Sequence, residues 1–416
     1  MGYINLKYKP SKNDLIAVFY VEPATDEVFE AIAGESSIGT WTSLTTLTPE
    51  IRKKLGAKVF FIDRKNKIIK IAYPSALFEK GNMPQILSSI AGNIFGMKDV
   101  KNLRLEDIKW PYALIKSFSG PKYGIRGIRK ILGIKKRPLV GSILKPKVGL
   151  SPKEQAKNAY LAWKNGIDVI KEDENLGDLE FNRFKKRIVE TLKARDKVEK
   201  ETGERKAYVP NITAETNEMI RRAKFVEQAG GRYVMVDIIT VGWAALQTLR
   251  NENLNLILHG HRSGHAAMIK GKHGISMLVI ADIARLIGID QLHIGAIVGK
   301  MFGEKEEVVH IGEEIEKRFI KENKRIHTLA KNWYHIKPVM AICSGGLHPG
   351  HVPTLVKYLG KDIICQFGGG LWGHKMGGEA GARAIRQALD ATLKKIPLKE
   401  YARSHIELKT ALDQWG

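Results

Sequence analysis

Short apolar runs alternate with longer amphipathic segments from about residue 138 onward, and this alternation restricts the possible folds more than any other feature. Eight runs are typical of buried strands: residues 139–144, 167–170, 207–212, 233–238, 254–258, 291–294, 339–343 and 363–367. Helical segments such as 152–165 and 215–229 separate most of them, and 379–393 follows the last. Eight strand–helix units over roughly 280 residues predict a TIM (β/α)8 barrel. An open doubly wound sheet is less favoured, because no G-x-G-x-x-G follows the first run.

The first 120 or so residues have a different pattern, typical of a small α+β domain. Apolar, β-branched runs at 15–21, 57–62 and 68–73 predict strands, the last two as a hairpin. Residues 26–33 and 83–94 have helical spacing. A stretch rich in Gly and Pro at 119–124 predicts the domain boundary. We therefore expect an α/β protein with an α+β (ferredoxin-like) domain over 1–120 and a catalytic TIM barrel over 121–416.

The composition is that of a folded protein with an unusually high positive charge. The sequence has 68 Lys and Arg against 44 Asp and Glu, a net charge of +24 and a pI near 9.7. Such a charge could serve nucleic-acid binding. However, basic residues are mixed with acidic ones, as in 192–201, and form no clustered stripe. We therefore expect solvated helix faces and no nucleic-acid partner.

The two cysteines cannot form a disulfide framework, so we expect a reducing, cytoplasmic location. Cys343 and Cys365 lie in apolar runs and are predicted to be inert core residues. The start of the chain resembles no signal peptide. The longest apolar stretch, 274–289, contains Asp282 and Arg285 and predicts a buried helix, so no membrane partner is expected.

Titratable residues or glycines follow nearly every apolar run, where the carboxyl ends of barrel strands would converge on one face. Turn formation alone would explain Gly, Asn and Asp at such positions, but not lysines and histidines. The residues are Lys145, Lys147, Lys171, Asp173, Glu174, Asn211, Asp237, His259, His261, Arg262, His293, Ser344, Gly345, Gly346, Gln366, Gly368 and Gly369. This face is therefore the predicted active site.

Lys171, Asp173 and Glu174 form the most informative group. Strand geometry places Lys171 and Asp173 on one face, with Glu174 at the mouth. Two carboxylates can bind Mg²⁺ through hard oxygens. Taken alone, the lysine is explained either by an ion pair, which is the simpler interpretation, or by reaction with CO₂ to give a carbamate, a third anionic oxygen ligand. Lys145 and Lys147, either solvated or facing the site, could act as acid or base.

The histidines favour proton transfer and anion binding over zinc. His259 and His261 share a strand face, but no Cys or carboxylate lies at a zinc spacing nearby. His261 beside Arg262 fits a base next to an anion clamp. His293 could be a core histidine, although its place at the end of a run favours the site.

Three glycine-rich segments follow the last three runs. The two loops that begin at Ser344 and Gly368 let backbone N–H groups approach phosphates, and the ends of barrel strands seven and eight are the usual phosphate site. Gly299 and Gly303 bracket Lys300, and this segment is either a mobile lid carrying a charge or an ordinary loop.

Together these residues resemble the large subunit of ribulose-1,5-bisphosphate carboxylase/oxygenase (Rubisco) over nearly the whole chain. Lys145-Pro-Lys-Val-Gly-Leu is similar to the family's K-P-K-x-G-L, and Lys171-Glu-Asp-Glu-Asn to its K-x-D-E-N metal motif. His261-Arg262, His293, Gly299-Lys300, Ser344-Gly-Gly and Gln366-Phe-Gly-Gly follow in the family's order, and residues 34–41 and 92–96 match two further signatures. The short N-terminus and the end at Trp415-Gly416 resemble the archaeal form III enzymes.

The resemblance implies a mechanism. Mg²⁺ would be held by Asp173, Glu174 and the carbamate of Lys171, which would help to remove the proton from carbon 3 of ribulose-1,5-bisphosphate. CO₂, or O₂ in a side reaction, would add to the enediolate, and cleavage would give two molecules of 3-phosphoglycerate. Lys145 would be a proton donor and acceptor, His261 a second proton acceptor, and Lys300 would close over the site and stabilise the carboxylation transition state.

The resemblance also implies substrate-binding residues and an assembly. Lys147 would bind substrate and support the metal end. One phosphate would be held by Arg262, His293, Ser344, Gly345 and Gly346, and the other by Gln366, Phe367, Gly368, Gly369, Thr40 and Trp41. Glu35, Thr40 and Asn93 would reach the barrel of a neighbouring subunit, which implies a homodimer or an assembly of dimers without a small subunit. Archaeal AMP or nucleotide degradation is the implied pathway.

The sequence departs from the family pattern at three places: Ser263-Gly264, Phe302 and Lys375. These departures affect expectations for lid closure, rate and CO₂/O₂ discrimination, not for the reaction class. Two alternatives remain: a Rubisco-like sugar-phosphate enolase or isomerase without carboxylation, and a non-enzymatic basic scaffold that binds nucleic acid. Intact Lys145, Lys300 and phosphate loops disfavour the first, and the absence of a nucleic-acid motif disfavours the second.

Overall fold

The computed structural model describes residues 2–299 and 305–416, which form two compact units. The N-terminal unit comprises the chain up to Gly120 together with Gly264–Ile287 and Lys317–Lys337. The barrel unit comprises Pro121–Ser263, Gly288–Glu316 and Pro338–Gly416. Two later segments therefore belong to the N-terminal unit. In the described residues, no helix is both long and apolar enough to cross a membrane.

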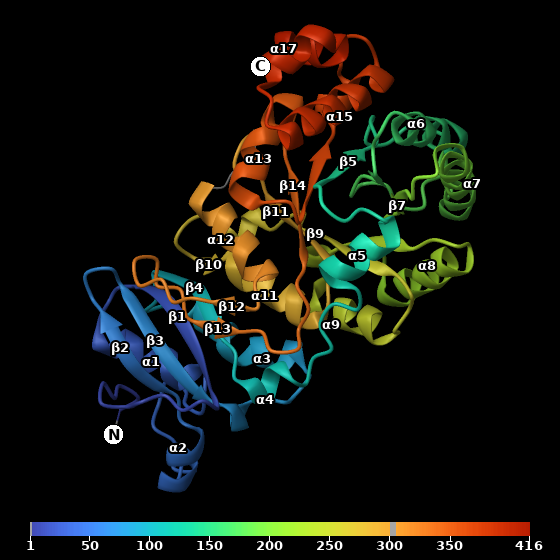
Figure 1. The fold of residues 1–416 in the computed structure, drawn as a ribbon. Coiled ribbons are helices and arrows are strands. Elements are labelled where there is room, and N and C mark those ends of the chain that lie inside the picture. Colours follow the sequence, from blue (N-terminus) through green and yellow to red (C-terminus); the bar gives the residue numbers. More distant parts are fainter. Residues whose placement is uncertain (1, 300–304) are drawn as a thin grey trace. The chain divides into compact units, whose positions relative to one another are not determined.

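The N-terminal unit is built on a five-stranded sheet in the order β10-β4-β1-β3-β2, seen in Figure 1. Its strands are β1 (Asp14–Glu22), β2 (Lys58–Asp63), β3 (Ile68–Pro74), β4 (Asn102–Lys109) and β10 (Gly274–Ile275), and its helices include α1 (Asp26–Glu35), α2 (Pro49–Leu55), α3 (Met83–Ile90), α4 (Tyr112–Ile115), α10 (Ala266–Ile269) and α11 (Met277–Ile287). The central strand β1 is antiparallel to both β3 and β4. The predicted α+β architecture is confirmed, although β4 and α2 were not predicted and the helix predicted over 83–94 ends at Ile90.

A buried charge cluster connects the three chain segments of the N-terminal unit. The Nζ atom of Lys331 lies 2.5 Å from Asp107 Oδ1 and 2.7 Å from Asp282 Oδ2. The three side chains come from β13 (Lys331–Asn332), β4 and α11. All three residues are buried, so removal of one partner would leave an uncompensated charge in the core. The buried helix predicted over 274–289 is present only over Met277–Ile287, as α11, and every residue of α11 is buried, whereas Gly274–Ile275 forms the strand β10.

The barrel unit contains eight parallel strands in the order β7-β6-β5-β15-β14-β11-β9-β8. The strands are β5 (Leu139–Ile143), β6 (Val169–Lys171), β7 (Ala207–Val209), β8 (Tyr233–Asp237), β9 (Ile257–His261), β11 (Gln291–Gly295), β14 (Met340–Ser344) and β15 (Ile363–Phe367). The backbone N–H of Met235 donates to the carbonyl of Pro210, and that of Ile212 donates to the carbonyl of Met235. These bonds join β8 to the chain after β7 and nearly close the ring. All eight predicted strands are present, and three of them differ from the prediction by more than one residue at an end. The strand β6 begins at Val169 rather than at residue 167, β7 ends at Val209 rather than at residue 212, and β9 begins at Ile257 rather than at residue 254.

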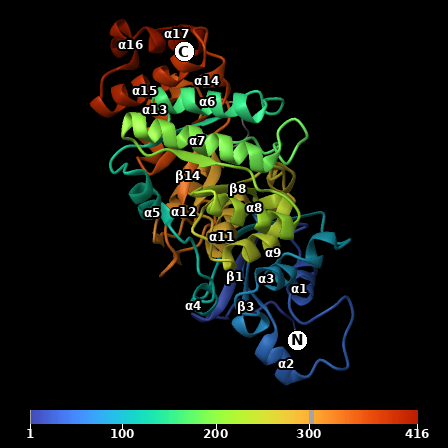
Figure 2. The same cartoon turned by 90° about the vertical axis from the view of Figure 1, so that its right-hand side faces the viewer.

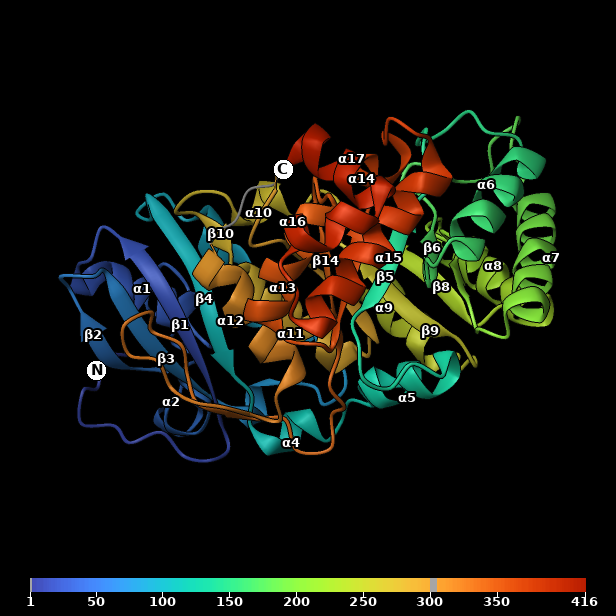
Figure 3. The same cartoon turned by 45° about the horizontal axis from the view of Figure 1, so that its top comes forward.

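Helices surround this ring, as Figures 2 and 3 show. They include α5 (Gly124–Leu132), α6 (Pro152–Lys164), α7 (Phe184–Thr202), α8 (Thr216–Gln228), α9 (Ile238–Asn251), α12 (Lys305–Glu316), α13 (Val352–Leu359), α14 (Gly369–Trp372), α15 (Gly378–Lys394), α16 (Leu398–Tyr401) and α17 (Ile406–Trp415). A reciprocal capping box between Ser151 and Glu154 fixes the start of α6. Helices α6 and α7 lie side by side, and α13 packs against α15 and β15.

The barrel interior changes from apolar to polar along the strands. At the amino-terminal end a core cluster includes Leu139, Val169, Met235, Ile342 and Ile364, with Ile125, Ile128 and Leu132 of α5 packed beneath it. Because side chains alternate with period 2, the next inward positions lie two residues further along each strand. These positions are polar in most strands. A layer of polar side chains, here called the polar floor, therefore lies on the apolar core at the carboxyl end of the barrel.

Candidate active site

The polar floor of the barrel brings together eight of the seventeen residues predicted at the strand ends, together with Gln291, which was not predicted. Its inward-facing members are Lys171, Asn211, Asp237, His259, His261, Gln291, His293, Ser344 and Gln366. In parallel strands these positions share one edge, which in barrels carries the active site. Hydrogen bonds and ion pairs connect many of these side chains. Eight of the nine residues lie on six of the barrel strands, and Asn211 follows β7.

Lys171 ends β6 and is completely buried. Its Nζ donates to the backbone carbonyl of Glu172 at 2.8 Å. Burial lowers the pKa of Lys171 to about 8, against the opposing effect of Glu174 and Asp173. The two carboxylates make their direct ion pairs with Lys145 and Lys147. Lys171 is therefore an amine that can lose its proton near neutral pH, which reaction with CO₂ requires.

Asp173 and Glu174 follow β6, and both are in contact with lysines from the end of β5. Lys145 Nζ lies 2.5 Å from Asp173 Oδ2, and Lys147 Nζ lies 3.2 Å from Glu174 Oε1. Burial raises the pKa of Glu174, but a backbone hydrogen bond and the nearby His261 and Lys171 have a larger, opposite effect and lower the pKa to about 2. Glu174 is therefore an anion at the site mouth, next to Asp173.

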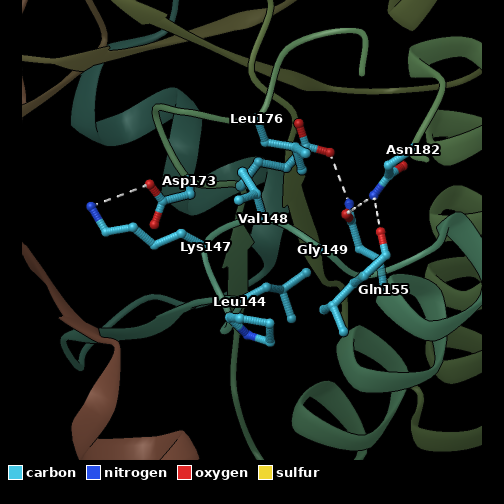
Figure 4. A pocket seen from close by; sticks show the side chains of 11 residues that line it. Leu144, Lys147, Val148, Gly149, Gln155, Asp173, Leu176 and Asn182 are labelled. Atoms are coloured by element: carbon cyan, nitrogen blue, oxygen red, sulfur yellow. Dashed lines mark hydrogen bonds and ion pairs between the residues drawn. The ribbon is translucent and has the colours of Figure 1, made fainter. Parts of the chain in front are cut away.

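One oxygen of Asp173 is unsatisfied. Asp173 Oδ1 is buried and has no hydrogen-bond partner within residues 2–299 and 305–416; Lys147 Nζ is 3.8 Å away. Figure 4 shows this carboxylate directed toward Lys147 and away from Gln155 and Asn182, beside a small pocket of about 10 Å³, enough for one water molecule. A buried carboxylate oxygen without a donor fits coordination of a hard cation.

Glu172, between the predicted ligands, was not predicted as important. It is fully buried and turned away from the site, where it accepts from Arg187 Nε at 2.6 Å, from Gln155 Nε2 at 2.9 Å and from the hydroxyl of Tyr208. The backbone N–H of Asn211 also donates to it, at 2.8 Å. This network fixes the backbone between Lys171 and Asp173. The alternation of side chains along β6 was the available signal, since it places Glu172 opposite Lys171.

His261 ends β9 and is nearly enclosed. Its Nε2 lies 3.7 Å from Glu174 Oε2 and its Nδ1 lies 3.7 Å from Asp237 Oδ1. Burial, with a further effect of Lys171, lowers the pKa of His261 despite these carboxylates. The imidazole is therefore neutral at pH 7 and can accept a proton.

Arg262 follows His261 and is directed toward β11. Burial lowers the pKa of Arg262 to about 10, so the guanidinium remains charged at pH 7. A Cβ atom on Gly295 would lie 2.8 Å from Arg262 Nη2, and the φ of Gly295 is +97°. The positive φ favours glycine at that position, and the short contact shows that the guanidinium of Arg262 reaches β11. Arg262 and His293, which lies on β11, thus occupy the same part of the site.

The glycine-rich loops after β14 and β15 are also in the barrel unit. Gly345 and Gly346 have φ of 119° and 79°, and a Cβ on Gly299 would lie 2.3 Å from the carbonyl oxygen of Gly345. The segment before Lys300 therefore lies against the loop after β14. Lys300 and Phe302 themselves lie outside the described residues.

Gln366 on β15 has a free amide. Its Oε1 and Nε2 are both buried, and neither has a partner in the part of the chain that is described. The absence of a side chain on Gly141 makes room for it, because a Cβ there would be 2.6 Å from Gln366 Oε1. Lys145 Cε would lie 3.4 Å from a Cβ on Gly368. Lys145 and Gln366 are thus both close to the loop after β15.

Comparison with known proteins agrees with this geometry. Residues 124–415 match the family model of the ribulose bisphosphate carboxylase large chain, catalytic domain, and residues 2–114 match that of its N-terminal domain. The chain belongs to this family. The ribulose bisphosphate carboxylase of Methanocaldococcus jannaschii is 49% identical over 424 residues, with 100% of both chains covered, and that of Methanosarcina mazei is 48% identical, covering 99% of this chain and 98% of the other. The predicted family and enzyme class, a carboxylase that is a carbon–carbon lyase, agree with these names.

Solved structures of archaeal Rubisco share the fold. The dimeric enzyme from Hyperthermus butylicus has a TM-score of 0.93 at 44% identity, covering 100% of this chain and 98% of the other. The octameric enzyme from Pyrococcus horikoshii, solved with a sulfate ion, has a TM-score of 0.91 at 45% identity, covering 99% and 96%. The predicted fold class, a Rubisco-type N-terminal domain and an eight-stranded barrel, is confirmed.

The remaining predicted Rubisco site residues lie in the N-terminal unit. Asn93 Nδ2 donates to Glu35 Oε1 at 3.3 Å, so these two side chains form a pair. Thr40 is exposed, and Trp41 is 92% exposed, an unusual position for so large an aromatic side chain. Their assignment to substrate binding stays a prediction.

Proposed function

We propose that the chain is a Mg²⁺-dependent ribulose-1,5-bisphosphate carboxylase that adds CO₂ to the enediolate and cleaves the product to two molecules of 3-phosphoglycerate. The observation that carries the proposal is the unsatisfied, buried Oδ1 of Asp173, next to Glu174 and Lys171. Buried carboxylate oxygens without a hydrogen-bond donor are uncommon, and one at this place fits coordination of a cation. Family membership supports the same reaction. Oxygenation as a side reaction and a role in archaeal AMP or nucleotide degradation complete the proposal.

Asp173, Glu174 and a carbamate on Lys171 would hold the Mg²⁺. Among the described residues, no three His, Cys, Asp or Glu side chains could hold a metal ion by themselves, so the third ligand would come from Lys171. When bound, Mg²⁺ would act as a Lewis acid toward substrate oxygens. Asn211 Nδ2 donates to the carbonyl of Glu174 at 3.0 Å and so holds the loop that carries both carboxylates.

The chain's own residues would move the protons and bind the substrate. Lys145 would donate and accept a proton at the enediolate, and neutral His261 would accept one during hydration and cleavage. Lys147 would turn from Glu174 to the substrate. Lys300 would stabilise the carboxylation transition state. One phosphate would be bound by Arg262 and by the backbone N–H groups of the loop formed by Ser344, Gly345 and Gly346, next to His293. The other would be bound by Gln366, Phe367, Gly368 and Gly369, with Thr40 and Trp41.

We propose a homodimer, or an assembly of dimers, as the active form. Glu35, Thr40, Trp41 and Asn93 would contribute to the site in a partner's barrel. The dimeric and octameric assemblies named for the archaeal Rubisco structures support this arrangement. Exposure of Trp41 also supports it, because a large exposed aromatic side chain is typical of an interface.

NMR of the products tests the reaction class. With ribulose-1,5-bisphosphate, Mg²⁺ and bicarbonate, we expect two molecules of 3-phosphoglycerate for each bisphosphate consumed. An enolase or isomerase would instead give one sugar-phosphate product per substrate. That result would replace the proposed carboxylase with the Rubisco-like alternative.

Activation by CO₂ should depend on pH through Lys171. Carbamate formation needs the neutral amine, whose fraction rises with pH. With a pKa of about 8, we expect the activation rate at constant dissolved CO₂ to rise about tenfold from pH 7 to pH 9 and to level off above pH 9. Enzyme stripped of CO₂ and Mg²⁺ would be activated at each pH and assayed at one pH. A rate that still rises tenfold per pH unit at pH 9 would mean that Lys171 is not desolvated.

Replacement of Gly141 with Ala should weaken substrate binding. The new Cβ would come within 2.6 Å of Gln366 Oε1 and push the amide from its place. We expect the KM for ribulose-1,5-bisphosphate to rise about tenfold, the effect of one lost polar contact, with a smaller change in kcat. Gly177→Ala is the matched control, because a Cβ there meets nothing within 4 Å. Equal KM values for the two variants would remove Gln366 from the substrate site.

A further inference from the structure

Four side chains form a single file of hydrogen bonds across the floor of the barrel. Gln291 Oε1 lies 3.0 Å from His259 Nδ1, the Nε2 atoms of His259 and His293 lie 2.9 Å apart, and His293 Nδ1 lies 2.8 Å from Ser344 Oγ. The file therefore runs from β11 to β9, back to β11 and on to β14. Gln291 and His259 are completely buried and His293 is 3% exposed, whereas Ser344, at the far end, is partly exposed.

Both histidines in this file are neutral. Two Nε2 atoms 2.9 Å apart have room for one hydrogen atom between them, so one ring donates and the other accepts. Burial lowers the pKa of both histidines well below the usual range, and the cations that face them, Lys171 for both and Arg262 for His293, lower it further. His261, in ring contact with His293, acts in the same direction. Each neutral imidazole donates through one nitrogen and accepts through the other. Whether Gln291 accepts or donates at one end of the file therefore determines whether Ser344 donates or accepts at the other end.

The direction follows from Gln291. With Oε1 facing His259 and the amide Nε2 buried without a partner among the described residues, the oxygen accepts, so His259 carries its hydrogen on Nδ1 and accepts through Nε2. His293 must then donate from Nε2 and accept through Nδ1. The hydroxyl of Ser344 consequently donates to His293. Toward the site mouth, the Ser344 oxygen can therefore only accept a hydrogen bond.

We propose that Gln291 is a positioning residue that, through His259 and His293, keeps Ser344 as a hydrogen-bond acceptor for a substrate hydroxyl group. Gln291 is separated from Ser344 by two imidazole rings and does not itself reach the site mouth. The inference rests on the proposed function for the identity of the hydroxyl, which belongs to a sugar bisphosphate. The direction of the file is a property of the free protein and is independent of that function.

Nitrogen-15 NMR of histidine-labelled protein without substrate tests the direction of the file. We expect His259 as the Nδ1–H tautomer and His293 as the Nε2–H tautomer, assigned with His259→Gln and His293→Gln variants. In Gln291→Met, which keeps the side-chain length but removes the acceptor, both rings should become mixtures of tautomers. The opposite tautomers in the wild type, or unchanged tautomers in Gln291→Met, would overturn the proposal whether or not the chain is a carboxylase.

A double-mutant cycle tests the connection to Ser344. We expect Gln291→Met to lower kcat/KM about tenfold, the effect of one misdirected hydrogen bond, and to have no further effect when Ser344 is already Ala. If the two substitutions lower kcat/KM independently, so that their effects multiply, Gln291 acts through packing and the proposal fails. Near-ultraviolet circular dichroism confirms that each variant is folded.

Discussion

Lys171→Arg is expected to abolish carboxylation, with a loss of at least about 10³-fold, while the protein stays folded. Arginine keeps a positive charge at the end of β6 but cannot form a carbamate. An ion-pair role would tolerate this exchange, whereas a metal site that needs a third anionic oxygen would not. Steady-state carboxylation at saturating Mg²⁺ and CO₂ gives the measurement.

The matched control for this variant is Lys206→Arg. Lys206 is also a completely buried lysine of the barrel unit, but its Nζ bonds to the carbonyl of Ile167 and to Glu204. We expect it to retain activity within a few-fold. Substantial activity in Lys171→Arg would support the ion-pair interpretation. Equal inactivation of both variants would show only that arginine does not fit at buried lysine positions.

Mixing two inactive variants should restore activity if two subunits share each site. Asn93→Ala would damage the contribution of the N-terminal unit, and Lys171→Ala that of the barrel. After random exchange about half of the dimers are heterodimers, each with one intact site, so activity should return to about a quarter of wild type. Activity assays after dissociation and reassembly, with exchange confirmed by native mass spectrometry, give the result.

A mixture of Asn93→Ala with Glu35→Gln is the control for complementation. Both substitutions lie in the N-terminal unit, and the two side chains are hydrogen-bonded to each other. Every site in their heterodimer would contain one damaged N-terminal unit, so no activity should return. Recovery in this control, or no recovery in the first mixture despite exchange, would contradict a shared site.

The sequence predicted the barrel and its polar rim because both depend on local patterns. Lys171, His261 and Gln366 end apolar runs, and parallel strands bring such ends together. The strand β4 was not predicted, although the alternation of polar and apolar residues in Asn102–Lys109 was an available signal. The inclusion of residues 264–287 and 317–337 in the N-terminal unit depends on long-range contacts such as Lys331 with Asp107, which no local pattern shows.

Within the site, the sequence predicted which residues take part, but not which side chains they contact. Lys145 was predicted at the site, but its pairing with Asp173 depends on the turn between β5 and α6. Glu172 and Gln291 were missed for a common reason. Each acts through other side chains, Glu172 through Arg187 and Gln291 through His259, and such roles depend on three-dimensional neighbours.

Fixation of ¹⁴C-bicarbonate tests the central claim most directly. With Mg²⁺, ribulose-1,5-bisphosphate and enzyme activated with unlabelled CO₂, we predict one acid-stable ¹⁴C per bisphosphate consumed, recovered in the carboxyl group of 3-phosphoglycerate. Consumption of the bisphosphate without incorporation of ¹⁴C would contradict the account.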